Sequence, residues 1–357
     1  GQTYIYMAFA ADPDTEAPTV AKSFSTVAYT GAGGTQSIDG FGFSPSLIWI
    51  KNRTNAYSHQ LYDSVRGAGN DKNIQSDNTS AEGVDANLYG FISSFDSDGY
   101  TVQSGTTTGF NNIWTNQSGQ NYVAWAWKAD DNEPTINTEG SIDSLVSANA
   151  NAGFSIAKYE GTGSDTTIGH GLSAAPEMII IKNLDQTDDW VVYHSAVGTS
   201  QFLVLNSTTA ASGSGTIFGS PNDTGVAPTS TVFTVGSNHK SGANGENYIA
   251  YCFHSVAGYS KIGSYTGTSS SGNSVNVGFA PDWVLIKGAS SGSAWILHDT
   301  VRSDGTAHLR PNTSGAEDTG SNEQINFTST GFSIRNSGAT QINTSGDTYI
   351  YMAFKIN

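Results

Sequence analysis

The chain has 357 residues and a net charge of −16, and charged residues make up only 13% of it. Such an acidic surface repels phosphate backbones, which excludes nucleic acid as the expected partner. The sequence has no apolar run of 18 or more residues, which argues against membrane insertion through a helix, and its single cysteine excludes an internal disulfide. Aromatic residues at 11% and 41 glycines are instead typical of a polar, turn-rich all-β protein.

The first predicted element is a strand at residues 1–9, GQTYIYMAF, which closely matches GDTYIYMAF at 346–354. Two further versions are GQNYVAWAW at 119–127 and GENYIAYCF at 245–253. Each begins with a turn glycine and continues with alternating large and small residues, the pattern of a half-buried strand. We expect residues 1–9 to be the terminal strand of a preceding repeat, either in a longer protein or, by β-augmentation, in a neighbouring chain.

Between these segments the sequence repeats itself three times. The predicted organisation, in chain order, is a linker at 10–23, a repeat at 24–128, a linker at 129–153, a repeat at 154–254 and a repeat at 255–357. Both linkers are acidic and contain proline, as spacers do. Almost no linker separates the second and third repeats. We therefore expect these two to form a rigid pair, and the first repeat to move relative to them.

Each repeat contains an apolar strand that ends in lysine, followed twelve residues later by a polar residue. The lysines are Lys51, Lys182 and Lys287, and the polar residues are Asp63, His194 and Asp299. Apolar residues on both faces predict central strands, covered on one side by a partner sheet and on the other by a neighbouring domain or chain. Many short strands within about 100 residues predict tandem β-sandwich repeats of the jelly-roll or lectin-like kind.

The strongest candidate ligand-binding residues are two acid–base pairs, Asp63 with Arg66 and Asp299 with Arg302. A carboxylate beside a guanidinium can bind the vicinal hydroxyls of a sugar. The same pair can also serve as a framework ion pair that anchors a strand end. The second repeat carries His194 at the aspartate position, so the fold does not require the pair. Both interpretations stay open.

Two tryptophans, Trp190 and Trp295, stand just before the polar residues of the second and third repeats. An exposed tryptophan beside an Asp or His would stack on the apolar face of a sugar ring, whereas a buried one would fill the core. We therefore count Trp190 and Trp295 among the candidate ligand-binding residues, together with His194 and the two acid–base pairs.

The sequence predicts no catalytic residues and no metal ligands with recognisable spacing. Asp63 and Asp299 are carboxylates of the kind that glycoside hydrolases use, but they lie in different repeats, so a polysaccharide depolymerase is a minor hypothesis. Acidic runs at 12–16, 96–98 and 130–133 offer oxygen ligands, which leaves calcium (Ca2+) as the one cofactor to test.

The segments NTEGSIDSLVSANANAGFSIAKYEGTGS at 137–164, IGHGLSAAPEMIIIKN at 168–183 and NYIAYCFHSVAGYSKIGSYTG at 247–267 carry a resemblance to a known group of proteins. They resemble the repeated domains of tail-fibre-like structural proteins of tailed, often marine, bacteriophages. The resemblance implies a location on the virion, other virion proteins as partners, a homo-oligomer with a trimer favoured, and attachment to a host-surface glycan. It implies no active-site residues.

Three functions are therefore weighed. The first is a phage tail fibre or appendage that attaches to a host glycan. The second is a structural component without a ligand, such as a capsid decoration or a fibre shaft. The third is an enzyme or a secreted bacterial adhesin. For the first function, we expect the ligand to contact loops that differ between the repeats, namely 289–293, 306–324 and 336–346.

Overall fold

The computed structural model describes residues 20–213, 216–219 and 224–356. The predicted strand at 1–9 and most of the linker at 10–23 lie outside the described residues. The described chain is built almost entirely of antiparallel strands, with one short helix, α1 (Ala86–Tyr89), and one 3-10 turn, η1 (Ser321–Glu323). The prediction of an all-β, sandwich-type fold is confirmed.

The first repeat contains two antiparallel sheets. An inner sheet has the strand order β1-β7-β3-β4, and a smaller outer sheet has the order β2-β6-β5. The strands are β1 (Phe24–Thr30), β2 (Gln36–Asp39), β3 (Leu47–Asn52), β4 (Gln60–Asp63), β5 (Phe91–Asp96), β6 (Gly99–Gln103) and β7 (Asn121–Trp127). The terminal strand β7 therefore lies inside the sheet, between β1 and β3.

The same inner-sheet order recurs in the second and third repeats, as β10-β17-β12-β13 and β18-β24-β20-β21. The second repeat has β10 (Phe154–Glu160), β11 (Thr166–Gly169), β12 (Met178–Asn183), β13 (Val191–His194), β14 (Gln201–Val204), β15 (Ser212–Gly213), β16 (Val232–Val235) and β17 (Asn247–Phe253). The third has β18 (Ser260–Thr266), β19 (Ser274–Asn276), β20 (Trp283–Gly288), β21 (Ile296–Asp299), β22 (Ile325–Thr328), β23 (Gly331–Ile334) and β24 (Thr348–Phe354). Strands β11 and β16, and β19, β23 and β22, form the outer sheets.

The segment 129–153, expected to be a linker, contributes two strands instead. They are β8 (Thr135–Asn137) and β9 (Ser144–Asn149). Strand β9 pairs with the outer edge of β10, and β8 pairs with β9. Together with β14 and β15 at the opposite edge, they extend the second repeat's sheet to eight strands. Pro134 and the acidic residues that suggested a spacer lie before β9, which has the sequence SLVSAN.

The doubly apolar strands are buried on both faces, as predicted. Along β3, Ile48 and Ile50 point into the first repeat's own sandwich core, whereas Leu47 and Trp49 point the other way into a second apolar cluster. This second cluster, which we call the shared core, contains residues from all three repeats. The apolar surface that covers the outer face of these strands therefore comes from the other repeats of the same chain.

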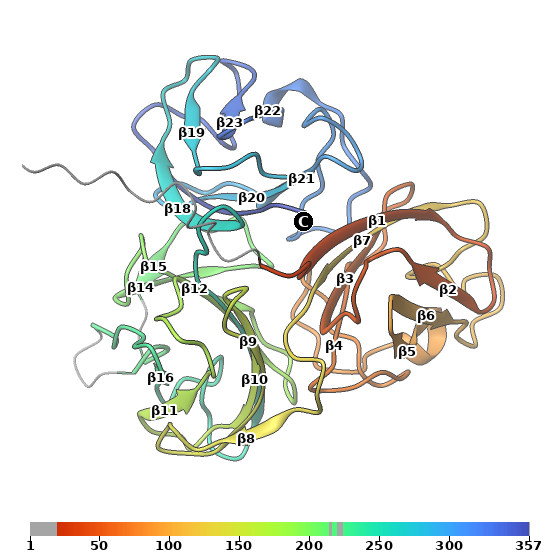
Figure 1. The fold of residues 1–357 in the computed structure, drawn as a ribbon, viewed down its shortest axis with the longest axis vertical. Helices are drawn as coiled ribbons and strands as arrows, with labels where there is room; N and C mark the ends of the chain where they lie inside the picture. The colour runs from red at the N-terminus through yellow and green to blue at the C-terminus, as the bar shows by residue number, and fades with distance from the viewer. Residues whose placement is uncertain (1–19, 214–215, 220–223, 357) are drawn as a thin grey trace, which may run out of the picture.

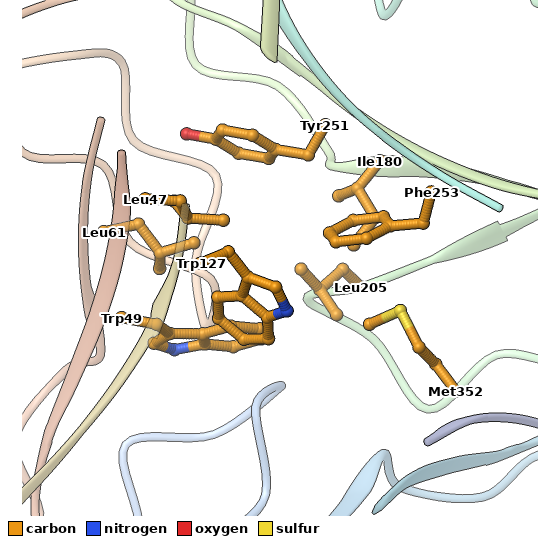
Figure 2. A pocket seen from close by; sticks show the side chains of 9 residues that line it. All are labelled: Leu47, Trp49, Leu61, Trp127, Ile180, Leu205, Tyr251, Phe253 and Met352. Atoms are coloured by element: carbon orange, nitrogen blue, oxygen red, sulfur yellow. The ribbon is translucent and has the colours of Figure 1, made fainter. Parts of the chain in front are cut away.

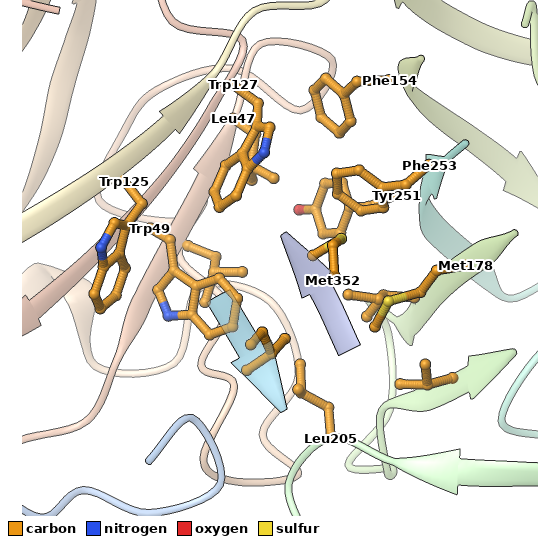
Figure 3. Close-up of a cluster of buried hydrophobic side chains, with 14 of the residues drawn as sticks. Leu47, Trp49, Trp125, Trp127, Phe154, Met178, Leu205, Tyr251, Phe253 and Met352 are labelled. Carbon is orange, nitrogen blue, oxygen red and sulfur yellow. The ribbon is translucent and has the colours of Figure 1, made fainter. Parts of the chain in front are cut away.

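The three repeats surround a common centre, as Figure 1 shows. There the Trp127 ring lies 6.5 Å from Phe154, 6.3 Å from Phe253 and 5.8 Å from Phe354, in side-chain contacts that join the first repeat to the other two. Figure 3 shows Trp127, Phe253 and Met352 of the shared core converging from different sheets. The expectation that the first repeat moves independently is therefore wrong, because its tryptophans are buried between the other repeats.

Candidate functional site

The first acid–base pair lies at the interface between the first and second repeats. Asp63 ends β4 and is fully buried. Its Oδ2 accepts hydrogen bonds from Arg66 Nε at 2.5 Å and from the hydroxyl of Tyr251, in the second repeat, at 2.8 Å. Arg66 also donates to Glu82 and to the carbonyl of Lys72. The pair therefore anchors one repeat to the next.

The second pair plays the same part between the third and first repeats. Asp299 Oδ2 accepts from Arg302 Nε at 2.5 Å and from the indole of Trp125 at 2.9 Å. The Arg302 guanidinium lies 5.5 Å from the centre of the Trp125 ring, within cation–π range. Glu317 then links Arg302 to Arg53 of the first repeat, at 2.9 and 2.7 Å. These contacts favour the framework interpretation over the sugar site for both pairs.

The interface between the second and third repeats lacks such a pair. His194 is fully buried, and its Nδ1 accepts from the backbone N–H of Ala196. Burial lowers the pKa of His194 to about 4, so the ring is neutral at pH 7. Val197 occupies the position of the two arginines, and a surface pocket of about 170 Å3 lies beside it, lined also by Ala211 and Ala289.

The two candidate tryptophans are buried and act between repeats. Trp190 Nε1 donates to the carbonyl of Gln75 at 2.8 Å, and Trp295 Nε1 donates to the carbonyl of Val204 at 2.9 Å. His59, which precedes Asp63 by the same four residues, bonds to the carbonyl of Arg310 at 3.2 Å. Sequence reasoning missed His59, although its spacing could have identified it.

The backbone N–H groups of these three residues are also capped by side chains at equivalent positions. The N–H of His59 donates to the side chain of Asp77. Asn206 and Asn312 accept the equivalent N–H groups of Trp190 and Trp295. An Asp can replace an Asn at this position because only the side-chain acceptor is used.

The strand-ending lysines are a further set of interface residues. Lys51 Nζ donates to the carbonyl of Ser314 at 2.9 Å, and so reaches from the first repeat to the third. Lys182 and Lys287 donate in the same way to Thr79 and Thr208, each in the preceding repeat. Burial lowers the pKa of each lysine to about 8. The sequence pattern located these lysines but did not assign them this role.

The third-repeat loops proposed to contact ligand are partly committed to interfaces. In the 306–324 loop, Glu317 pairs with Arg53, and Pro311 accepts a hydrogen bond from the Ser76 hydroxyl. In the 289–293 loop, the Ala289 carbonyl accepts from the backbone of Ala211 in the second repeat. Parts of the first two loops are therefore occupied by contacts between repeats, whereas residues 290, 292 and 319–322 and much of the 336–346 loop stay exposed or partly exposed.

A small cavity lies at the centre of the molecule (Figure 2). Its volume is about 10 Å3, close to the minimum for one water molecule. The residues that line it come from all three repeats: Leu47, Trp49, Leu61, Trp127, Ile180, Leu205, Tyr251, Phe253 and Met352. Since the cavity is enclosed by apolar side chains and is too small for a sugar or cofactor, we regard it as a packing gap of the shared core.

A second surface pocket, of about 200 Å3, lies in the first repeat. It is lined by Ser44, Pro45, Ser46, Ser64, Phe95, Asp130, Asp131, Asn132, Glu133 and Pro134. Asp131 forms an ion pair with Lys128 at 2.6 Å, and Asp130 Oδ1 accepts from Asn132. The pocket thus combines an aromatic wall, hydroxyl groups and carboxylates.

Of the acidic runs considered for calcium, the one at 96–98 is held by local hydrogen bonds. Asp96 accepts from Ser94 and Thr101, and Asp98 accepts from the backbone of Gly40. Over the residues that the structure describes, no three His, Cys, Asp or Glu side chains are grouped to hold a metal ion. The run at 12–16 lies outside those residues. In the same described part, no helix is long and apolar enough to cross a bilayer.

The fold and the buried polar clusters define an all-β protein whose sandwich repeats are joined through a shared apolar core. The chain belongs to the family described as a domain of unknown function, DUF7483, whose model matches residues 19–357. No curated protein and no solved structure matches it.

Proposed function

We propose that this chain is a structural protein of a bacteriophage particle, a tail fibre or appendage that attaches the particle to a host-surface glycan. The observation that carries the proposal is the shared core, which makes one body of three repeats. The side chains that could have done chemistry, including Asp63, Asp299 and His194, are buried in the interfaces that join them. We therefore propose a non-enzymatic role, in which stability and surface contact matter more than catalysis.

Two further features support this role. Low charge density leaves a surface of hydroxyl and amide groups, which suits contact with uncharged sugars. The sequence resemblance to phage tail-fibre-like proteins supports a location on the virion, with other virion proteins as partners. It also supports a homo-oligomer, with a trimer favoured. The doubly apolar strands no longer argue for that oligomer, because they are covered within the chain.

The test is a binding survey of the purified chain. Its mass in solution is measured by light scattering, and its binding to immobilised bacterial polysaccharides and to whole cells is measured with and without calcium. Saturable binding to a glycan would support attachment, since several weak sites in one particle gain avidity. Absence of binding by a correctly folded sample would favour the alternative, a structural component such as a capsid decoration or fibre shaft.

A further inference from the structure

The surface pocket of the first repeat lies at a position where the three repeats carry different residues. Each repeat caps one backbone N–H in the same way. The N–H lies two residues after the terminal strand (β7, β17 or β24), and the side chain that accepts its hydrogen bond lies just before β3, β12 or β20. Glu177 accepts this bond from Ser255 at 2.6 Å, and Asp282 accepts it from Ile356 at 2.8 Å. In the first repeat the acceptor is Ser46.

The shorter side chain leaves room in front of the capped N–H. Ser46 Oγ accepts from the N–H of Ala129 at 2.9 Å, so the structural bond is kept. In the third repeat the longer Asp282 also accepts a hydrogen bond from the Thr300 hydroxyl at 3.0 Å, across the corresponding position. The residue equivalent to Thr300 in the first repeat is Ser64, which lines the open pocket.

Several polar groups around this pocket make no polar side-chain contact within the described part of the chain. The hydroxyls of Ser44 and Ser64 and the carboxylate of Glu133 make no side-chain hydrogen bond or ion pair with any residue that the structure describes. Phe95, half-buried on β5, provides one wall. A concave site with an aromatic wall and a few unpaired polar groups is the usual form of a small-ligand site.

The chemistry of these groups matches a sugar. The C–H face of a pyranose packs on an aromatic ring, and its neighbouring hydroxyls donate to a carboxylate and exchange hydrogen bonds with serine hydroxyls. Asp130, Asp131 and Glu133 place negative charge on the rim, and the cation Lys128 pairs with Asp131. That charge disfavours uronic acids, sialic acids and sulfated sugars.

We propose that this pocket binds one neutral or amino-substituted sugar residue of a glycan. The proposal rests on the function proposed above and adds to it a site and a preference for uncharged or cationic sugars. Of the three equivalent positions, the first carries Ser46, whereas the other two carry the longer acidic residues Glu177 and Asp282.

The experiment compares full-length variants on an array of neutral, amino-substituted and acidic oligosaccharides. The variant S46D/S64T gives the first repeat the residues that occupy this position in the third. Because Asp282 caps the same N–H, the variant is expected to fold, and thermal unfolding checks that it does. Glu133→Gln removes one unpaired carboxylate, and Asp143→Asn, an exposed charge outside the pocket, is its matched control.

We expect the unmodified chain to bind neutral or amino sugars and not acidic ones. We expect S46D/S64T and E133Q to weaken that binding about tenfold or more, and D143N to leave it unchanged. If the unmodified chain binds glycans and both pocket variants bind equally well, the pocket proposal is overturned while glycan attachment stands. If the unmodified chain binds no glycan, the attachment function itself is overturned. A preference for acidic sugars would also contradict the pocket.

Discussion

At the scale of single residues, the buried acid–base pairs hold neighbouring repeats together. Asp299 and Arg302 are both removed from water, and each has further partners in Trp125 and Glu317. Taking a charged pair out of water costs free energy that its mutual attraction only partly recovers. The second repeat, with His194 and Val197, shows that the fold forms without the pair.

The pair is therefore expected to be costly to break and cheaper to remove. Asp299→Ala leaves Arg302 buried with Glu317 as its only carboxylate, and should lower the free energy of unfolding by about 3–5 kcal/mol. The double variant D299A/R302A should lose less than the single one. Urea denaturation measures both. A single variant within about 1 kcal/mol of the unmodified chain would show that the Asp299 charge contributes little.

The buried histidines predict the response to acid. Burial lowers the pKa of His298 to about 3, and those of His194 and His308 to about 4. Unfolded chains bind protons at histidine near pH 6.5, whereas these folded ones do not until lower pH. The unfolded state then holds more protons, so stability is lost as pH falls from about 6.5 to 4.

We expect the midpoint of thermal unfolding to fall across that window, before most carboxylates titrate. His194→Met removes one of the titrating groups and should make the fall shallower. Val192→Ala, at a buried residue of the same strand that does not titrate, is the comparison and should lower stability without changing the slope of the pH profile. Equal profiles for H194M and the unmodified chain would show that His194 does not contribute.

At the scale of elements, strand β9 is the clearest addition to the repeated plan. It lies between β10 and β8, so its backbone donates into the sheet on both sides, and Val146 packs at 6% exposure. Strand β8 lies at the edge, with Ile136 68% exposed. Proline removes a backbone donor, which matters within a sheet and much less at its edge.

Val146→Pro should therefore lower the free energy of unfolding by about 2–4 kcal/mol, from a lost ladder bond and disturbed packing. Ile136→Pro should cost clearly less. Denaturant unfolding of both variants tests this. Equal losses would mean that β9 does not support the second repeat's sheet.

The positions of many strands could be predicted from sequence, because they depend on local patterns of apolar and polar residues. The alternation around Trp125 and the doubly apolar run at Ile179–Ile181 indicated strands buried on both faces. Those patterns could not show whether the covering surface belongs to the same chain, since any apolar face satisfies them. The role of Asp63 was likewise undecided by sequence, because a pair at i and i+3 has the same spacing at a surface as at an interface.

At the scale of the whole molecule, the shared core makes the repeats depend on one another. Trp49, Trp125 and Trp127 all belong to this core and are covered by side chains of the other repeats. A first repeat taken alone would expose that face to water, at a cost of about 25 cal/mol for each Å2 of apolar surface. Independent folding of the repeats is therefore disfavoured, unlike in an extended array of domains.

Calorimetry should consequently show one transition for the whole chain, with equal calorimetric and van't Hoff enthalpies. Trp127→Ala, at the centre, should lower the free energy of unfolding by about 3–5 kcal/mol through the cavity that it leaves. Ile92→Ala changes only the first repeat's own sandwich core and should lower the same single transition without splitting it. Two separate transitions, with only the earlier one shifted by Ile92→Ala, would mean that the first repeat unfolds independently and that the shared core is weaker than its burial indicates.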